Sequence, residues 1–177
     1  MRWGLVPAGE RGSARPRLLA NARSETAAKL PAFRASVAAR RCLVPANGFY
    51  EWRLEGGVKR PHLFTLSDGE PFAFAGLWDP VSGDLPETYC ILTTEPNELV
   101  GTVHDRMPVI LTPETMPQWL GDRPLEASVL TSLFRPIPSG RMAVRPVSRF
   151  VSNSRNEGPE CLAPPDDAPP EPEFDFV

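Results

Sequence analysis

Short apolar runs, each bounded by glycine, proline or polar residues, recur along the first 112 residues of the chain. Runs of about five or six residues with turn-forming residues at their ends are typical of β-strands. We therefore expect strands within residues 2–7, 41–52, 62–66, 72–78, 88–94 and 106–112. Gly56 and Gly57 separate two strand-like stretches, and this arrangement predicts a β-hairpin that turns at the two glycines.

Three stretches have a helical pattern. Residues 24–40 begin with Ser24, a good N-cap residue, and Pro31 within them must kink the helix or start a new one. Residues 112–121 carry Thr112 as a cap, Pro113 at the first helical position and Gly121 as the stop. A weaker pattern covers residues 124–134. Many short strands with two or three short helices predict an α+β, mainly β fold with a barrel-like or folded-over antiparallel sheet.

The length of 177 residues predicts about one domain, which we place at residues 1–162. Residues 163–177 contain no basic residue and no apolar periodicity, and they are rich in proline and acids. This composition is typical of a disordered tail.

The net charge of −3 is unevenly distributed along the chain. The first sixty residues hold twelve Lys or Arg against four Glu, a net charge of +8, and ten of the twelve are Arg. Arginine is suited to forked contacts with phosphate, so this half is compatible with a polyanionic partner. A solvated basic face is the alternative interpretation.

Cys42, Cys90 and Cys161 are far apart and form no CxxC or Cys/His ligand spacing. We therefore expect reduced thiols, no metal and no cofactor. No apolar stretch approaches eighteen residues, and the N-terminal segment lacks the apolar region of a signal peptide. These observations predict a cytoplasmic protein without a membrane span.

Candidate chemistry comes from polar residues with apolar surroundings. Asn21 and Arg23 end an apolar stretch before a predicted helix, Glu51 lies within the sequence GFYEW, and His104 precedes a predicted strand. A set of Asn, Glu and His could perform general acid–base catalysis, with the pKa of Glu51 raised by its apolar setting. Glu51 could equally face solvent, Asn21 could be a turn residue, Arg23 a surface cation and His104 structural.

Six blocks in a fixed order carry a stronger signal: RWGLVP, NARSETAAKLPAFR, RRCLVPANGFYEW, FAGLWD, TTEPN and HDRMPVIL. Together they resemble the SOS response-associated peptidase (SRAP) family, which processes abasic sites in single-stranded DNA. Residues 144–162 resemble the C-terminal end of that family. The resemblance implies an SRAP-like fold and a monomer whose partner is single-stranded DNA containing abasic sites.

The resemblance also implies a reaction. Family members expose an N-terminal Cys by removing their own initiator Met, and its amine and thiol condense with the abasic-site aldehyde into a thiazolidine crosslink. By motif, Asn21 would hold the reacting residue, Glu51 would be the acid/base near the amine, and His104 would move protons at the sugar. The class of enzyme implied is a peptidase or hydrolase with a possible lyase activity.

The DNA-binding residues implied by the same motifs are Arg23 and Arg106, which would contact phosphates, and Trp3, which would line the groove. Where many members carry tryptophans after WGLVP, this chain offers Arg11, Arg15 and Arg17. We therefore expect a more electrostatic mode of DNA binding, because stacking is worth about 1–3 kcal/mol per base.

Residue 2 of this chain is Arg, and the Met-Cys-Gly-Arg start of the family is absent from it. None of the three cysteines combines an amine and a thiol at a terminus. We therefore expect the chain as given to form no thiazolidine. The alternatives to an abasic-site enzyme are a crosslinking-inactive module that binds single-stranded DNA and an unrelated hydrolase that uses Glu51 and His104.

Overall fold

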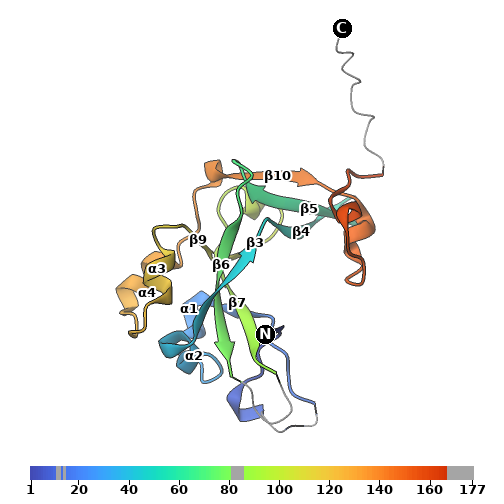
Figure 1. Cartoon of the computed structure of the whole chain (residues 1–177). Helices are drawn as coiled ribbons and strands as arrows, with labels where there is room; N and C mark the ends of the chain where they lie inside the picture. Colours follow the sequence, from blue (N-terminus) through green and yellow to red (C-terminus); the bar gives the residue numbers. More distant parts are fainter. Residues whose placement is uncertain (11–12, 14, 81–85, 167–177) are drawn as a thin grey trace.

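The computed structural model describes residues 1–10, 13, 15–80 and 86–166, and its strands form two sheets (Figure 1). The larger sheet has seven strands: β1 (Arg2–Trp3), β2 (Asn21–Arg23), β3 (Arg41–Ala46), β6 (Phe72–Asp79), β7 (Thr88–Thr94), β8 (Met107–Pro108) and β9 (Ile110–Leu111). The smaller sheet has the order β10 (Met142–Pro146), β5 (Val58–Leu66) and β4 (Phe49–Glu55).

Four short α-helices lie on one side of the larger sheet, away from the smaller one (Figure 1). They are α1 (Ser24–Ala27), α2 (Arg34–Ala39), α3 (Met116–Leu120) and α4 (Ala127–Leu133). Five 3-10 helices occupy connections: η1 (Ala8–Glu10), η2 (Val100–Thr102), η3 (Ser139–Arg141), η4 (Arg149–Ser152) and η5 (Pro159–Leu162). None of the described helices is long and apolar enough to cross a membrane.

Strand β7 organises the larger sheet. On one edge it pairs with β1 and β2, both parallel to it, and on the other with β6 and β8, both antiparallel. Strands β6 and β7 pair only over residues 76–79 and 88–91, and beyond this point the segment 107–111 lies between them. Val109 joins both neighbours, because its N–H donates to Leu92 and its carbonyl accepts from Ala75.

Two apolar cores hold these layers together. The first lies between the larger sheet and the helices and is centred on fully buried Trp119, which packs edge-on against Phe134. The second lies between the two sheets, where Phe49 stacks on Phe64 and meets Phe74 edge-on. Burial of large aromatic side chains is the main favourable term at both places.

The chain passes from the larger sheet to the smaller one at Asn47 and Gly48, between β3 and β4. A Cβ atom at Gly48 would lie 2.7 Å from the carbonyl oxygen of Phe64, so only glycine fits this crossing. The crossing sets the position of β4, and with it the position of Glu51.

The mainly β, α+β class predicted from the sequence is confirmed, with four short helices. The larger sheet is mixed rather than antiparallel, because β1 and β2 run parallel to β7. Neither sheet closes into a barrel in the described part of the chain. The hairpin at Gly56 and Gly57 is confirmed, and its φ angles of 56° and 82° are those of a type I′ turn.

The predicted helix over residues 24–40 breaks near Pro31, as expected, into α1 and α2. Ser24 is wrong as the N-cap, because it is the first helical residue and is buried; Arg23 precedes it without a side-chain cap. The start expected at Thr112 is also wrong. Thr112 forms a turn with Thr115 first, and α3 begins at Met116 and ends at Gly121 as predicted.

The residues expected to form a tail divide into two parts. Residues 163–166 pack against the domain, since the N–H of Ser148 donates to the carbonyl of Ala163 and its hydroxyl donates to Asp166. Residues 167–177 lie outside the described part of the chain, and the prediction of disorder there stays a prediction.

Candidate nucleic-acid and catalytic site

The outer edge of β7 aligns three of the residues singled out by their motifs. Trp3 is opposite Tyr89 in the β1–β7 register, and Asn21 and Arg23 follow on β2 opposite Ile91 and Thr93. Asn21 and Arg23 are exposed while Ala22 between them is buried, so both side chains lie on the same open face.

Trp3 begins this row with 54% of its surface exposed. Its indole N–H donates to the carbonyl of Ala20, 2.9 Å away, directly before Asn21. This hydrogen bond holds a large aromatic face beside the open face of β2, which is the place that a base or sugar of a bound strand would need.

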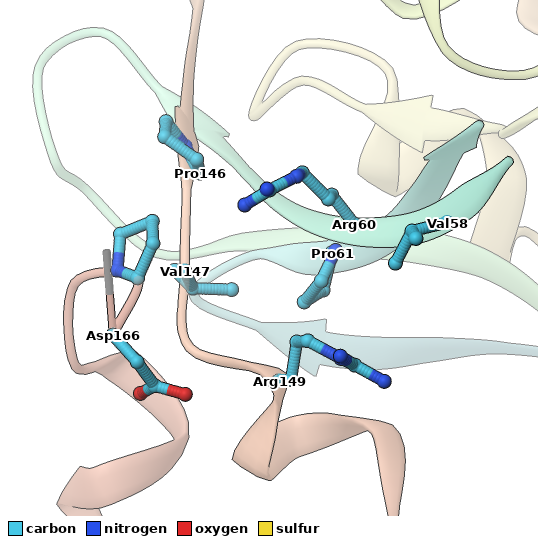
Figure 2. A pocket seen from close by; sticks show the side chains of 8 residues that line it. Val58, Arg60, Pro61, Pro146, Val147, Arg149 and Asp166 are labelled. Carbon is cyan, nitrogen blue, oxygen red and sulfur yellow. The ribbon is translucent and has the colours of Figure 1, made fainter. Parts of the chain in front are cut away.

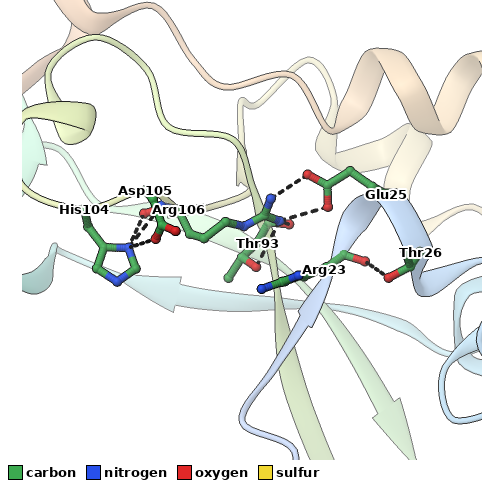
Figure 3. Close-up of polar contacts among 7 residues, drawn as sticks. All are labelled: Arg23, Glu25, Thr26, Thr93, His104, Asp105 and Arg106. Carbon is green, nitrogen blue, oxygen red and sulfur yellow. Dashed lines mark hydrogen bonds and ion pairs between the residues drawn. The ribbon is translucent and has the colours of Figure 1, made fainter.

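Arg106 lies at the end of the row, where it is held by Glu25. Its Nη1 and Nη2 donate to the two carboxylate oxygens of Glu25 at 2.6 and 2.9 Å, and Nη2 also donates to the carbonyl of Thr93 (Figure 3). The bond to Arg106 keeps the pKa of the Glu25 carboxyl below its usual range. The Nε of Arg106 is buried and, among the described residues, has no hydrogen-bond partner.

Glu51 and His104 form a pair on the other side of this row. Nε2 of His104, at the end of the η2 connection, lies 4.0 Å from Oε2 of Glu51 in β4. Burial raises the pKa of the Glu51 carboxyl, His104 opposes the rise, and Asp105 adds to it. The Glu51 side chain is only 23% exposed, against 42% for His104.

The hydrogen bonds of His104 indicate which nitrogen carries its proton when the ring is neutral. The backbone N–H of Arg106 donates to Nδ1 of His104 at 3.0 Å, so Nδ1 acts as an acceptor. Nε2 then bears the hydrogen and directs it at Glu51. Asp105 lies 3.2 Å from Nδ1 and stabilises the doubly protonated ring.

Glu51 and His104 open into a cleft of about 540 Å³ (volume in Å³) that is also lined by Trp52, Lys59, Arg149 and Ser152. The indole N–H of Trp52 donates to the hydroxyl of Ser152 at 3.0 Å, so the C-terminal segment forms one wall. Sequence analysis missed Trp52, Lys59 and Arg149. Trp52 directly follows Glu51, but nothing in the local sequence indicates that Lys59 and Arg149 meet beside it.

The structure thus brings the predicted residues together in two groups. Trp3, Asn21, Arg23 and Arg106 lie along β7, and Glu51 and His104 face the cleft. In the described residues, the side chain of Asn21 forms no hydrogen bond to either group.

Several arginines of the basic first half are occupied within the fold. Arg17 pairs with Glu10, and Arg40 pairs with buried Asp79. Arg41 is buried and donates to backbone carbonyls at the ends of α2 and α3. The charge of +8 therefore overstates the number of cations that a polyanion could contact. Arg11 lies outside the described residues.

The cysteines do not lie in a nucleophilic setting. Burial raises the pKa of the Cys42 thiol to about 11 and that of Cys90 to about 12, so both stay protonated at neutral pH. Cys161, in η5, donates weakly to the carbonyl of Asn156. All three thiols are free, and no group of three potential metal ligands occurs in the described part of the chain.

Comparison with known proteins identifies relatives over almost the whole chain. The chain is 39% identical over 166 residues to the abasic site processing protein YoqW of Bacillus subtilis (strain 168), covering 92% of this chain and 74% of that one. It is 32% identical over 166 residues to the abasic site processing protein YedK of Escherichia coli (strain K12), covering 92% and 72%. With HMCES of Gallus gallus, also named an abasic site processing protein, identity is 33% and coverage 93% and 56%.

A solved structure shares the fold. The crystal structure of a protein from Bacteroides thetaiotaomicron superimposes with a TM-score of 0.80 at 32% identity, covering 92% of this chain and 74% of that one. A family model described as "SOS response associated peptidase (SRAP)" matches residues 1–154.

Proposed function

Because the chain belongs to the SOS response associated peptidase (SRAP) family, we propose that it processes abasic sites in single-stranded DNA as part of a response to DNA damage. The observation that supports this proposal is the Glu51–His104 pair. A carboxyl of raised pKa and an imidazole face one cleft, next to an exposed row of Trp3, Asn21 and Arg23. The partner is DNA, and the finer proposal is a single strand bound by a monomer.

Glu51 is the proposed acid/base. Condensation of an amine with the aldehyde of a ring-opened abasic site releases one water molecule, which leaves only after the carbinolamine oxygen gains a proton. A carboxyl with a raised pKa retains a proton nearer to neutral pH and can donate it at this step. The resulting carboxylate can then accept the proton that the attacking thiol loses.

His104 is the proposed proton carrier between Glu51 and the sugar. Its Nε2 faces Glu51, and its ring orientation is held by the N–H of Arg106 at Nδ1. Because 42% of the His104 side chain is exposed, the ring can reach a bound substrate. Asn21, with its side chain free on β2, is proposed to orient the reacting amine.

Arg23 and Arg106 are the proposed phosphate contacts on the β7 side, and Trp3 supports the strand. Arg23 is the more available of the two cations, because Glu25 already occupies the guanidinium of Arg106. The hydrolase-type self-processing and the lyase-type activity of the family are proposed to use the same Glu51–His104 pair.

The proposal is tested with single-stranded DNA that carries one abasic site. We expect the protein to bind this DNA, and Arg23→Gln to weaken binding by roughly fivefold. Processing, followed as strand cleavage or as a covalent adduct on a denaturing gel, should fall about 100-fold or more in Glu51→Gln, with binding largely unchanged.

A matched control is Glu70→Gln, which changes an exposed carboxylate in the β5–β6 connection. Binding of abasic DNA with no processing by the unmodified protein would support the crosslinking-inactive DNA-binding module instead. Absence of binding to single-stranded DNA would refute the proposed function as a whole.

A further inference from the structure

We propose that Lys59 and Arg149 form a second phosphodiester-binding pair, on the opposite side of Glu51 and His104 from Arg23 and Arg106. A bound single strand then crosses the Glu51–His104 pair with cations on both flanks. The inference rests on the proposed function, because it takes the occupant of the cleft to be a nucleic-acid strand.

The two cations reach the cleft from parts of the chain that are 90 residues apart. Lys59 lies at the start of β5, opposite Leu54 of β4, and is therefore three positions from Glu51 toward the hairpin turn. Arg149 begins η4. Both line the cleft of about 540 Å³ with Glu51 and His104, and its size falls within the range of about 300–1,000 Å³ that is common for ligand sites.

Arg149 is held in place by the C-terminal segment. The hydroxyl of Ser148 accepts from the N–H of Phe150 and donates to Asp166, and the N–H of Ser148 donates to Ala163. At the other end of η4, Ser152 accepts from the indole of Trp52. These bonds fix η4 against β4, so the base of the Arg149 side chain is placed by the fold rather than by a mobile loop.

Neither cation is neutralised in the described part of the chain. Lys59 and Arg149 are exposed and form no ion pair there, in contrast with Arg17, Arg40 and Arg106. Asp166, the acidic residue near Arg149, is hydrogen-bonded to Ser148, and Figure 2 shows its carboxylate and the Arg149 guanidinium pointing in different directions. Two free cations in one cleft attract an anion that supplies negative charge along a line.

The direction of His104 places this pair opposite the β7 row. Figure 3 shows the side chains of His104 and Arg106 extending in opposite directions from adjacent parts of one segment, with Arg23 and Glu25 on the Arg106 side. His104 lines the cleft with Lys59 and Arg149, whereas Arg106 does not. A linear chain of phosphates that contacts both pairs therefore passes His104 and Glu51 on the way.

The experiment measures affinity for three single-stranded oligonucleotides that carry a stable tetrahydrofuran analogue of an abasic site, which cannot react. One has nucleotides on both sides of the analogue, one only on its 5′ side and one only on its 3′ side. Binding is measured by fluorescence anisotropy at several salt concentrations for the unmodified protein, Lys59→Gln, Arg149→Gln and the double variant. Arg155→Gln and Arg123→Gln, two exposed arginines outside the cleft, are the matched controls.

We expect each single substitution in the cleft to weaken binding of the two-sided oligonucleotide by up to about fivefold, and the controls to have little effect. The slope of log affinity against log salt should fall by about 0.7 for each lost phosphate contact. The double substitution should weaken binding of only one of the two one-sided oligonucleotides. Arg23→Gln should weaken binding of the other.

The outcomes separate this inference from the proposed function. If the unmodified protein binds none of the oligonucleotides, the proposed function itself fails. If it binds them and Arg23→Gln weakens binding while the double variant behaves like the controls, only the second phosphate-binding pair is refuted. Equal losses for both one-sided oligonucleotides would refute its placement on one flank.

Discussion

The environment of Glu51 differs from that of an ordinary strand carboxylate. Its side chain is largely covered, and the charge within reach is divided between His104, which favours the ionised form, and Asp105, which disfavours it. Burial is the largest influence and raises the pKa of the carboxyl. Folding therefore makes this carboxyl a stronger proton carrier at the expense of some stability when it is ionised.

Glu51→Gln should show this cost as a pH-dependent gain in stability. The folded state holds the Glu51 proton above pH 4.5, where the unfolded chain has released it, so stability falls as pH rises from 4.5 through the raised pKa. The Gln variant lacks this loss. We expect its melting temperature to exceed that of the unmodified protein at pH 7 and the difference to vanish below pH 4.5. A constant difference across this range would contradict the assignment.

Glu25 limits what Arg106 can offer to a phosphate. The carboxylate takes both terminal nitrogens of the guanidinium, so a phosphate that approaches Arg106 also meets a negative charge. Arg106 keeps its bond to Thr93 in the absence of Glu25, because Nη2 donates to the Thr93 carbonyl directly. Glu25 therefore reduces the positive potential of the β7 row without being needed to hold Arg106 there.

Glu25→Gln should tighten binding of single-stranded DNA by about threefold at low salt and steepen the salt dependence by about 0.7. Fluorescence anisotropy with an oligonucleotide lacking an abasic site measures both quantities, and Glu70→Gln is the control. Weaker binding would instead identify Glu25 as a residue that positions Arg106. Because the pKa of Glu25 is lowered, its pair with Arg106 contributes stability above pH 4.5 and loses it as pH falls through the lowered pKa.

At the scale of elements, one buried arginine joins two helices to the larger sheet. Arg41, at the start of β3, donates to the carbonyls of Val37 and Ala38 at the end of α2. It also donates to Trp119, Gly121 and Arg123 around the end of α3, and its guanidinium lies 5.7 Å from the centre of the Trp119 ring. Helix C-termini present unpaired carbonyls and a partial negative charge, which a cation satisfies.

Arg41→Met should therefore lower the free energy of unfolding by about 3–5 kcal/mol, because several carbonyls lose their donors and the side chain loses its charge-assisted bonds. Urea denaturation at neutral pH measures the change. Arg34→Met, an exposed position on α2, is the control and should stay within about 0.5 kcal/mol. Similar free energies for the two variants would show that α2 and α3 do not depend on Arg41.

At the scale of the whole molecule, charge is separated between the domain and its C-terminal end. Residues 167–177 contain four acids and no basic residue, and removing them changes the net charge from −3 to +1. The last described residues pack beside Arg149 through Ser148, so the acidic segment starts near the cleft. We propose that it competes with DNA for the cations of the domain.

Truncation after Asp166 tests this proposal without removing the bonds that Ser148 makes to Ala163 and Asp166. We expect affinity for single-stranded DNA to rise about two- to fivefold at low salt and the difference to disappear near 1 M salt, where charges are screened within about 3 Å. Equal affinities at low salt would show that the acidic segment does not compete.

Much of the secondary structure follows from the sequence because its signals are local. Apolar runs with glycine or proline at their ends mark most of the strands, and Gly56 with Gly57 marks the hairpin turn. Pro31 and Gly121 end helices for reasons that lie within one turn of chain. The helix start at Thr112 was wrong because tertiary contacts favour a separate Thr112–Thr115 turn before α3.

The sequence by itself determined the class of fold, the order of its elements and, through six ordered motifs, the residues that carry the proposed chemistry. Only the tertiary structure decided that β1 and β2 run parallel to β7, that Glu25 occupies Arg106, and that Lys59 and Arg149 share a cleft with Glu51. The physical reason is range. Turns and strands depend on neighbours in the chain, whereas the availability of a charge and the pKa of a carboxyl depend on which distant residues fold against them.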